Sequence, residues 1–150
     1  MAQSLCKMLV HIVFSTKNRE RLIDTAIEPK LHAYMAGILE QMDSPAVLIG
    51  GADDHVHSLI LLSKNKALTE VIQEMKRGSS KWIKDQGSAY RSFYWQSGYG
   101  AFSIGQSSVN DLKVYIQNQR EHHLRTSFQD ELRLLFRKYE VEFDERYVWD

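Results

Sequence analysis

Short runs of apolar residues with strand-like spacing punctuate the chain. Residues 7–16 (KMLVHIVFST) are apolar and rich in β-branched side chains, which is typical of a strand covered on both faces. AVLIGG at residues 46–51 and HVHSLILL at residues 55–62 predict two more strands, and the tight segment between them predicts a hairpin. YGAFSI at residues 99–104 predicts a fourth strand.

Apolar residues recur at helical spacing in four further segments, residues 28–42, 67–83, 107–123 and 127–139. Gly78 is expected to be a weak point of the second segment, because glycine is a poor helix former. Ser108 with Asp111, and Ser127 with Asp130, predict capping boxes at the starts of the last two helices.

The order of these elements predicts the fold class. Strand, helix, strand, strand, helix, strand is the order of a ferredoxin-like or RRM-like layer, an α+β fold in which helices cover one face of an antiparallel sheet. Two C-terminal helices follow this unit. Because the sequence has no internal repeat or linker, we predict a single domain spanning residues 1–150.

Composition narrows the class of protein further. A hydrophobic share of 43% over 150 residues indicates an ordinary globular chain. Cys6 is the sole cysteine, so no internal disulfide can form and a reducing compartment is expected. The sequence has neither an apolar run of membrane-spanning length nor a signal-peptide layout, which predicts a cytoplasmic protein. Nineteen basic and nineteen acidic residues cancel, so nucleic-acid binding must depend on local patches.

The third predicted strand opens with two histidines. His55 and His57 are two residues apart and therefore project from the same face of a strand. Two neutral imidazoles on one face can ligate a divalent metal. An isolated H-x-H pair is more often structural, since two ligands do not complete a metal site and each ring can find a backbone or carboxylate partner.

A second group of polar residues lies in the segment 107–123. Tyr115 and Gln119 are four residues apart, which places them one turn apart on the same side of a helix. Each could instead be an ordinary core residue with its polar group satisfied. Together with His55 and His57, however, they supply two nitrogens, an amide oxygen and a phenol that could meet at one face of the sheet.

Three segments carry a resemblance to a known family. DDHVHSLILL, FYWQSGYGAFSIGQSS and VYIQNQREHHLRTSFQDELRLLFRKYEVEFDERYVWD resemble the single-tyrosine HUH transposases of small bacterial insertion sequences. The histidine–hydrophobic–histidine motif falls on residues 55–57. The nucleophilic tyrosine falls on Tyr115, and the third metal ligand falls on Gln119.

The resemblance implies a reaction. Enzymes of this family cut single-stranded DNA, often carrying a hairpin, and join a tyrosine to the 5′ phosphate while releasing a 3′ hydroxyl. A phenol with a pKa of about 10 is a poor nucleophile at neutral pH, so a metal ion is needed to offset charge on the phosphate. The resemblance implies Mg²⁺ or Mn²⁺ held by His55, His57 and Gln119. It also implies a homodimer in which Tyr115 of one subunit faces the histidines of the other, with no membrane or small-molecule partner.

Contacts to DNA are expected from basic side chains in two places. Three follow the first strand and two lie on one face of the second helix: Lys17, Arg19, Arg21, Arg77 and Lys81. Each has an ordinary alternative, because basic helix faces are usually solvated.

The remaining histidines are assigned to structure. His122 and His123 are adjacent, and neighbouring helical side chains diverge by roughly 100°, so the pair is not expected to serve one ion. We assign them to structure or to phosphate contact. His11 lies within the first strand and is expected to be a satisfied sheet residue.

Three alternatives to an insertion-element transposase stay open. A host-domesticated HUH nuclease would apply the same chemistry to dispersed genomic repeats. A replication-initiator or relaxase-like nuclease would also share it, although those enzymes typically differ in strand order and domain content. A non-catalytic RRM-like nucleic-acid-binding module would bind in a way indifferent to Tyr115→Phe and to chelators.

Overall fold

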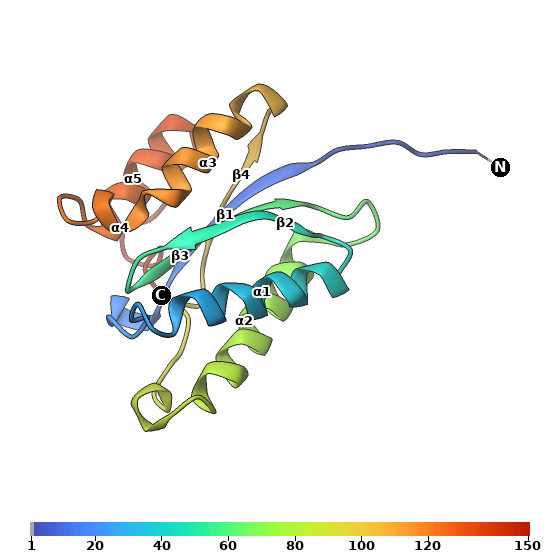
Figure 1. Ribbon diagram of the computed structural model, residues 1–150. Helices are drawn as coiled ribbons and strands as arrows, with labels where there is room; N and C mark the ends of the chain where they lie inside the picture. Colours follow the sequence, from blue (N-terminus) through green and yellow to red (C-terminus); the bar gives the residue numbers. More distant parts are fainter. Residues whose placement is uncertain (1) are drawn as a thin grey trace.

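A four-stranded antiparallel sheet forms the centre of the computed structural model, which describes residues 2–150 (Figure 1). The strands lie in the order β2-β3-β1-β4. Their bounds are β1 Leu9–Ser15, β2 Ala46–Gly51, β3 His55–Leu61 and β4 Gly100–Ile104. Each prediction of a strand from the apolar pattern is confirmed to within two residues at either end.

Helices cover both faces of this sheet (Figure 1). The helices are α1 Glu28–Gln41, α2 Leu68–Lys84, α3 Val109–Gln117, α4 Gln119–His122 and α5 Phe128–Lys138. Single 3₁₀ turns lie at η1 Lys17–Arg19, η2 Ser88–Tyr90 and η3 Gln106–Ser108. The α+β class and the expected element order are confirmed, and α3, α4 and α5 occupy the face that α1 and α2 leave open. In residues 2–150 no helix combines the length and apolar character that a bilayer crossing requires.

The alternation of side chains along β1 explains why both faces are covered. Ile12 and Phe14 are fully buried in the core beneath α1 and α2. Val13, which points the other way, is buried against Phe128 and its neighbours on α5. Because both faces of β1 are buried, the C-terminal helices can enclose polar groups that project from the sheet.

Two glycines permit close contacts between elements. A Cβ added at Gly50 on β2 would lie 2.5 Å from the backbone oxygen of Ile116, so α3 approaches the strand more closely than any side chain would allow. A Cβ at Gly78 would lie 2.7 Å from Cδ1 of Ile38. Although Gly78 was expected to weaken α2, the helix is continuous there, and the glycine lets α1 and α2 pack closely.

The segment 107–123 differs from its prediction. Instead of one helix, it forms η3, α3 and α4, with Asn118 (φ −97°, ψ 19°) between the two α-helices. The predicted cap at Ser108 is wrong, because this residue ends a 3₁₀ turn with helical dihedral angles and its hydroxyl makes no cap bond. The cap at Ser127 is confirmed, since its Oγ accepts a hydrogen bond from the amide of Asp130 at 3.1 Å.

Candidate active site

The two histidines of β3 point into the space between the sheet and the C-terminal helices. His55 and His57 are both fully buried. Gln119, at the start of α4, is also fully buried, and its Oε1 lies 2.8 Å from Nε2 of His55. The ring of Tyr115 on α3 has its centroid 5.7 Å from that of His57. The structure therefore brings together all four residues that the sequence motifs single out.

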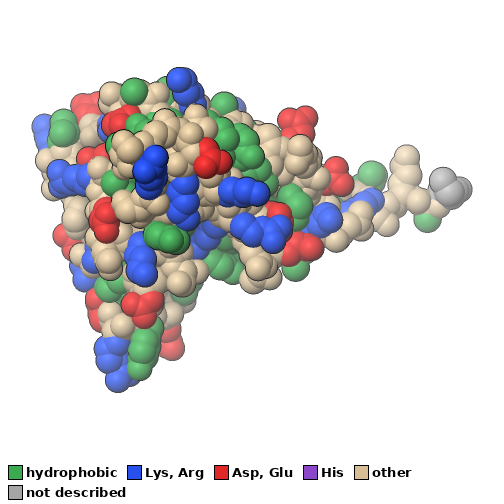
Figure 2. All heavy atoms as spheres, turned by 90° about the horizontal axis from the view of Figure 1, so that it is seen from below, with side chains coloured by type: hydrophobic (Ala, Val, Ile, Leu, Met, Phe, Trp, Pro, Cys, Tyr) green, Lys and Arg blue, Asp and Glu red, His purple; other side chains and the backbone are tan. Residues whose placement is uncertain are grey.

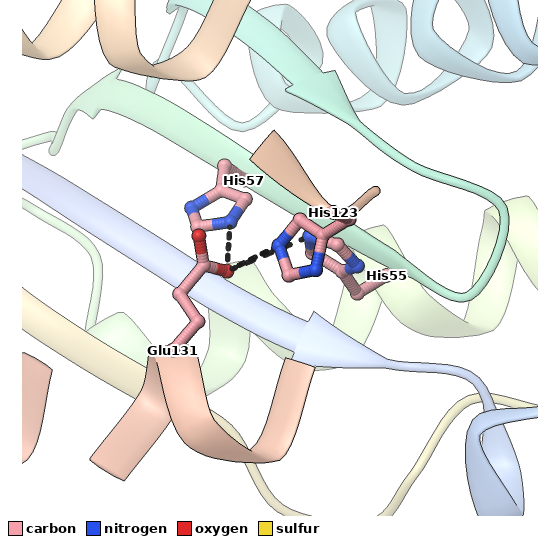
Figure 3. A group of neighbouring side chains, drawn as sticks. All are labelled: His55, His57, His123 and Glu131. Atoms are coloured by element: carbon pink, nitrogen blue, oxygen red, sulfur yellow. Dashed lines mark hydrogen bonds and ion pairs between the residues drawn. The ribbon is translucent and has the colours of Figure 1, made fainter. Parts of the chain in front are cut away.

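A carboxylate that the sequence analysis missed lies at the centre of this group. Glu131 on α5 is 2% exposed, and Figure 3 shows its carboxylate between His57 and His123. Oε1 accepts a hydrogen bond from Nε2 of His57 at 2.9 Å and lies 3.1 Å from Nε2 of His123 and 3.6 Å from Nε2 of His55. Oε2 accepts hydrogen bonds from the hydroxyl of Tyr115 and from Nε2 of Gln119.

Two further residues orient the histidine rings. Nδ1 of His55 donates to Oδ1 of Asp54 at 2.7 Å, and Nδ1 of His57 accepts from Nε2 of His11 at 2.8 Å. Each of these hydrogen bonds leaves Nε2 of the ring directed at the centre of the group. His11 is thus a satisfied strand residue through Nε2, as expected, but the residue that satisfies it is His57.

Burial and charge set the protonation of the group. Burial, followed by the charge of Glu131, raises the pKa of the Tyr115 hydroxyl well above its usual value, so the phenol is neutral here. Burial opposes ionisation of Glu131, but the close contact with His123 and the hydrogen bond from His57 lower the pKa of this carboxyl far below its usual range. Burial lowers the pKa of His11 to about 3, which keeps that ring neutral.

The donor atoms fit a divalent metal ion. The side chains of His55, His57, His123 and Glu131 each offer an atom, and these four atoms lie within 4.8 Å of one another. Ligands about 2.1 Å from one ion stand roughly 3 Å apart, which matches several of the separations above. Both nitrogens of His55 face oxygen atoms, so Nε2 requires either a second proton or a metal ion in its place.

The paired histidines lie on either side of the Glu131 carboxylate. Nε2 of His122 lies 3.4 Å from Oε2 of Glu131, whereas His123 approaches Oε1. The two rings diverge as expected, but α4 ends at His122 and the chain turns, which brings both rings to opposite oxygens of one carboxylate. His123, which we assign from the sequence to structure or to phosphate contact, therefore lies beside the other members of the candidate site.

Two cavities flank the site. One, of about 580 Å³, lies between β4, α3 and α5 and reaches Tyr115 and Glu131. The other, of about 560 Å³, reaches His123 and is bordered by Arg19, Arg21 and Arg120. The first cavity therefore gives access to Tyr115 and Glu131, and the second gives access to His123.

The predicted DNA-contact residues fall into two groups. Arg19 and Arg21 border the second cavity, and Lys17 lies exposed in the same 3₁₀ turn as Arg19. Arg77 and Lys81 are exposed on α2, across the sheet from the histidines. Figure 2 shows the face seen from below, where lysine and arginine side chains are interspersed with acidic ones.

A comparison with protein families shows to which family the chain belongs. The sequence model described as IS200-like transposase matches residues 4–119. The chain belongs to the IS200-like transposase family. The matched region includes His55, His57, Tyr115 and Gln119 but ends before His123 and Glu131. Membership supports a DNA-processing enzyme that acts in transposition.

Solved structures show the same fold. A candidate transposase from Deinococcus radiodurans R1 is similar with a TM-score of 0.63 and 17% identity, over 80% of this chain and 96% of that one. A REP-associated tyrosine transposase bound to a REP hairpin is similar with a TM-score of 0.56 and 13% identity, over 77% of this chain and 68% of that one. A comparison with curated proteins gives no match.

The position of Tyr115 bears on the predicted exchange between subunits. This transposase-family chain places Tyr115 against its own His57 and Glu131. In this structure the candidate site is assembled within one chain, without Tyr115 reaching the histidines of another subunit. A homodimer stays a prediction.

Proposed function

We propose that this chain nicks and rejoins single-stranded DNA at the ends of an insertion element through a 5′-phosphotyrosine on Tyr115. One observation carries the proposal: Tyr115, His55, His57 and Gln119, which come from three separate elements, converge on one buried carboxylate. A tyrosine phenol can serve as the nucleophile of covalent catalysis, and paired imidazoles with an amide oxygen can hold the metal ion that offsets charge on the phosphate.

In the proposed reaction the oxygen of Tyr115 attacks the scissile phosphorus. A bond forms between the tyrosine oxygen and phosphorus, and the proton of the phenol passes to Oε2 of Glu131, which accepts its hydrogen bond. The bond from phosphorus to the 3′ oxygen breaks, and the departing oxygen takes up a proton from solvent and leaves as a 3′ hydroxyl. The tyrosine ester conserves the energy of the broken phosphodiester. A second 3′ hydroxyl can then attack the ester, regenerate the phenol and rejoin strands without ATP.

The proposed cofactor is a divalent ion, Mg²⁺ or Mn²⁺. His55, His57 and Gln119 would hold it, and Asp54 and His11 would keep the two rings oriented. When bound, the ion polarises a non-bridging phosphate oxygen and aligns the scissile bond.

The proposed partner is single-stranded DNA, with a hairpin beside the cleavage site. The fold similarity to a transposase bound to a REP hairpin supports such a partner. Among the predicted contacts, Lys17, Arg19 and Arg21 are the best placed to bind phosphates near the site. We also propose that the chain acts as a homodimer, and that Arg77 and Lys81 bind DNA farther from the reacting atoms.

The proposal is tested by looking for a covalent product between the protein and DNA. We would incubate the protein with end-labelled single-stranded DNA from the flanks of its own gene, with Mn²⁺ or Mg²⁺, and resolve the products on a denaturing gel. The wild-type protein should yield a protein-linked strand, and Tyr115→Phe or EDTA should abolish it. Tyr139→Phe is the matched control, because Tyr139 borders the same cavity but stacks on Phe102 instead of contacting Glu131. A linked strand in the Tyr115→Phe variant would refute the proposed nucleophile.

A domesticated nuclease acting on dispersed repeats is the second candidate, favoured by the fold shared with the REP-associated enzyme. Repeat-derived hairpins should then be linked in preference to the flanking DNA. The non-catalytic alternative is less well supported, because binding alone does not account for the buried cluster of polar residues around Glu131.

A further inference from the structure

Glu131 contacts the proposed nucleophile and all three proposed metal ligands. Its Oε1 faces His57 and His55, and its Oε2 faces Tyr115 and Gln119. No motif or family match assigns this residue a role, because the matched region ends at Gln119.

We propose that Glu131 is itself a ligand of the metal ion, through Oε1, with His123 beside it. The inference builds on the proposed function, since it concerns the same ion. In this arrangement one carboxylate joins the metal to the nucleophile: Oε1 contacts the ion while Oε2 keeps the hydroxyl of Tyr115 close to it.

Charge balance supports this role. A carboxylate that is 2% exposed is costly to bury unless a positive charge lies next to it. Among the described residues, the ion-pair partners of Glu131 within 4.0 Å are all histidines, and no lysine or arginine lies that close to its carboxylate. A divalent cation between Oε1 and the imidazole nitrogens supplies the missing charge without requiring several protonated rings.

The donor set also indicates which ion the site prefers. His55, His57 and His123 offer nitrogen, whereas Glu131 and Gln119 offer oxygen. A site with three imidazoles favours a first-row transition ion over Mg²⁺, which prefers oxygen ligands and retains most of its water. Glu131 and His123 should therefore make Mn²⁺ bind more tightly than Mg²⁺.

The experiment measures metal binding without DNA. Mn²⁺ would be titrated into the metal-free full-length protein by calorimetry, for wild type, Glu131→Gln and Glu121→Gln. Glu121 is the matched control, because it is an exposed glutamate on α4 outside the cluster. Glu131→Gln should weaken Mn²⁺ binding by roughly 10-fold to 100-fold, the range typical of residues that support a metal site. Glu121→Gln should change it less than 2-fold, a shift of about 0.4 kcal/mol.

Folding and function can be separated from this result. Circular dichroism would show whether Glu131→Gln folds, and Glu131→Asp, which keeps the charge but withdraws the oxygen, would be measured beside it. If either folded variant binds Mn²⁺ as tightly as wild type, Glu131 is not a ligand. Because the calorimetry contains no DNA, a wrong nucleophile would appear in the DNA assay alone.

Discussion

Asp54 illustrates how a single side chain prepares the site before any ligand is bound. Its carboxylate accepts the Nδ1 proton of His55, which fixes the tautomer and directs Nε2 toward Gln119 and Glu131. Burial disfavours a charged His55, but the hydrogen bond to Asp54 and the charge of Glu131 raise the pKa of this ring. Nε2 is thus held where a positive charge, proton or metal, is favoured.

Asp54→Asn should accordingly weaken Mn²⁺ binding by roughly 10-fold, because an amide orients the ring but no longer increases its basicity. Asp53→Asn is the control, since the Asp53 carboxylate is 3.9 Å from exposed Arg21 and not hydrogen-bonded to a site histidine. Calorimetric titration of both variants checks the prediction. Equal affinities in the two variants would show that the Asp54 contact does not tune the ring.

The protein should lose stability in mild acid because of His32 on α1. Burial, followed by the charge of Arg120, lowers the pKa of His32 to about 4. An unfolded histidine binds its proton near pH 6.5, so between pH 6.5 and 4 the unfolded state holds more protons and the free energy of unfolding falls as the pH falls. At pH 5 this cost is about 2 kcal/mol.

The check is urea unfolding at pH 7.5 and pH 5.0 for wild type and His32→Gln. Because glutamine does not titrate, the variant should lose about 2 kcal/mol less than wild type between the two pH values. Other buried histidines titrate in both proteins and cancel in this difference. The same loss in both would show that His32 is not the group responsible.

At the scale of elements, local spacing predicted most of the fold and four residues of the candidate site. Residues 46–51 form β2 as predicted, because alternation and turn residues are local signals. The break at Asn118 could not be found this way, since α4 is held by Arg120, whose guanidinium reaches the backbone oxygen of Ile23 at 3.0 Å and Glu28 at 2.8 Å. That contact joins segments more than 90 residues apart.

Glu131 was missed for a similar reason. Its partners lie between 8 and 76 positions away along the chain, so no local motif contains it. One feature of the sequence does point to Glu131: it is a charged residue on the apolar stripe of the last helix, between Phe128 and Leu132. A glutamate on a buried stripe needs a partner of opposite charge, and a search for one would have led to the histidines.

The contact between β2 and α3 should be sensitive to the smallest added side chain. Gly50→Ala places a methyl group 2.5 Å from the Ile116 oxygen, which must displace α3 and with it Tyr115. We expect a loss of about 1–3 kcal/mol in the free energy of unfolding and a lower yield of linked DNA. Gly37→Ala is the control, since a Cβ there meets nothing within 4 Å and the helix should gain about 0.5–1 kcal/mol. Comparable stability of both variants would mean that α3 tolerates displacement.

At the scale of the whole molecule, the two faces of the sheet should contribute unequally to DNA binding. Arg19 and Arg21 border the cavity that reaches His123, whereas Arg77 and Lys81 lie across the sheet. Arg19→Gln with Arg21→Gln should weaken binding of single-stranded DNA more than Arg77→Gln with Lys81→Gln, although each pair removes two charges. Each lost ionic contact with a phosphate should also make the slope of log K against the logarithm of the salt concentration shallower by about 0.7. Fluorescence anisotropy at several salt concentrations measures both effects, and equal reductions in affinity would point to charge alone.

Each site should be built from the residues of one chain. Tyr115 donates to Glu131 of its own chain, and Arg120 joins α4 to residues 23 and 28, so exchange of α3 with another subunit would break contacts that the single chain makes. A mixture of His57→Ala and Tyr115→Phe proteins, unfolded and refolded together, should therefore form no linked DNA, because each chain lacks one essential group. Refolded wild type, and wild type mixed with Tyr115→Phe, are the controls for recovery. If the mixed variants regain activity, Tyr115 completes the site of another subunit, and α3 must leave the position described here when the dimer forms.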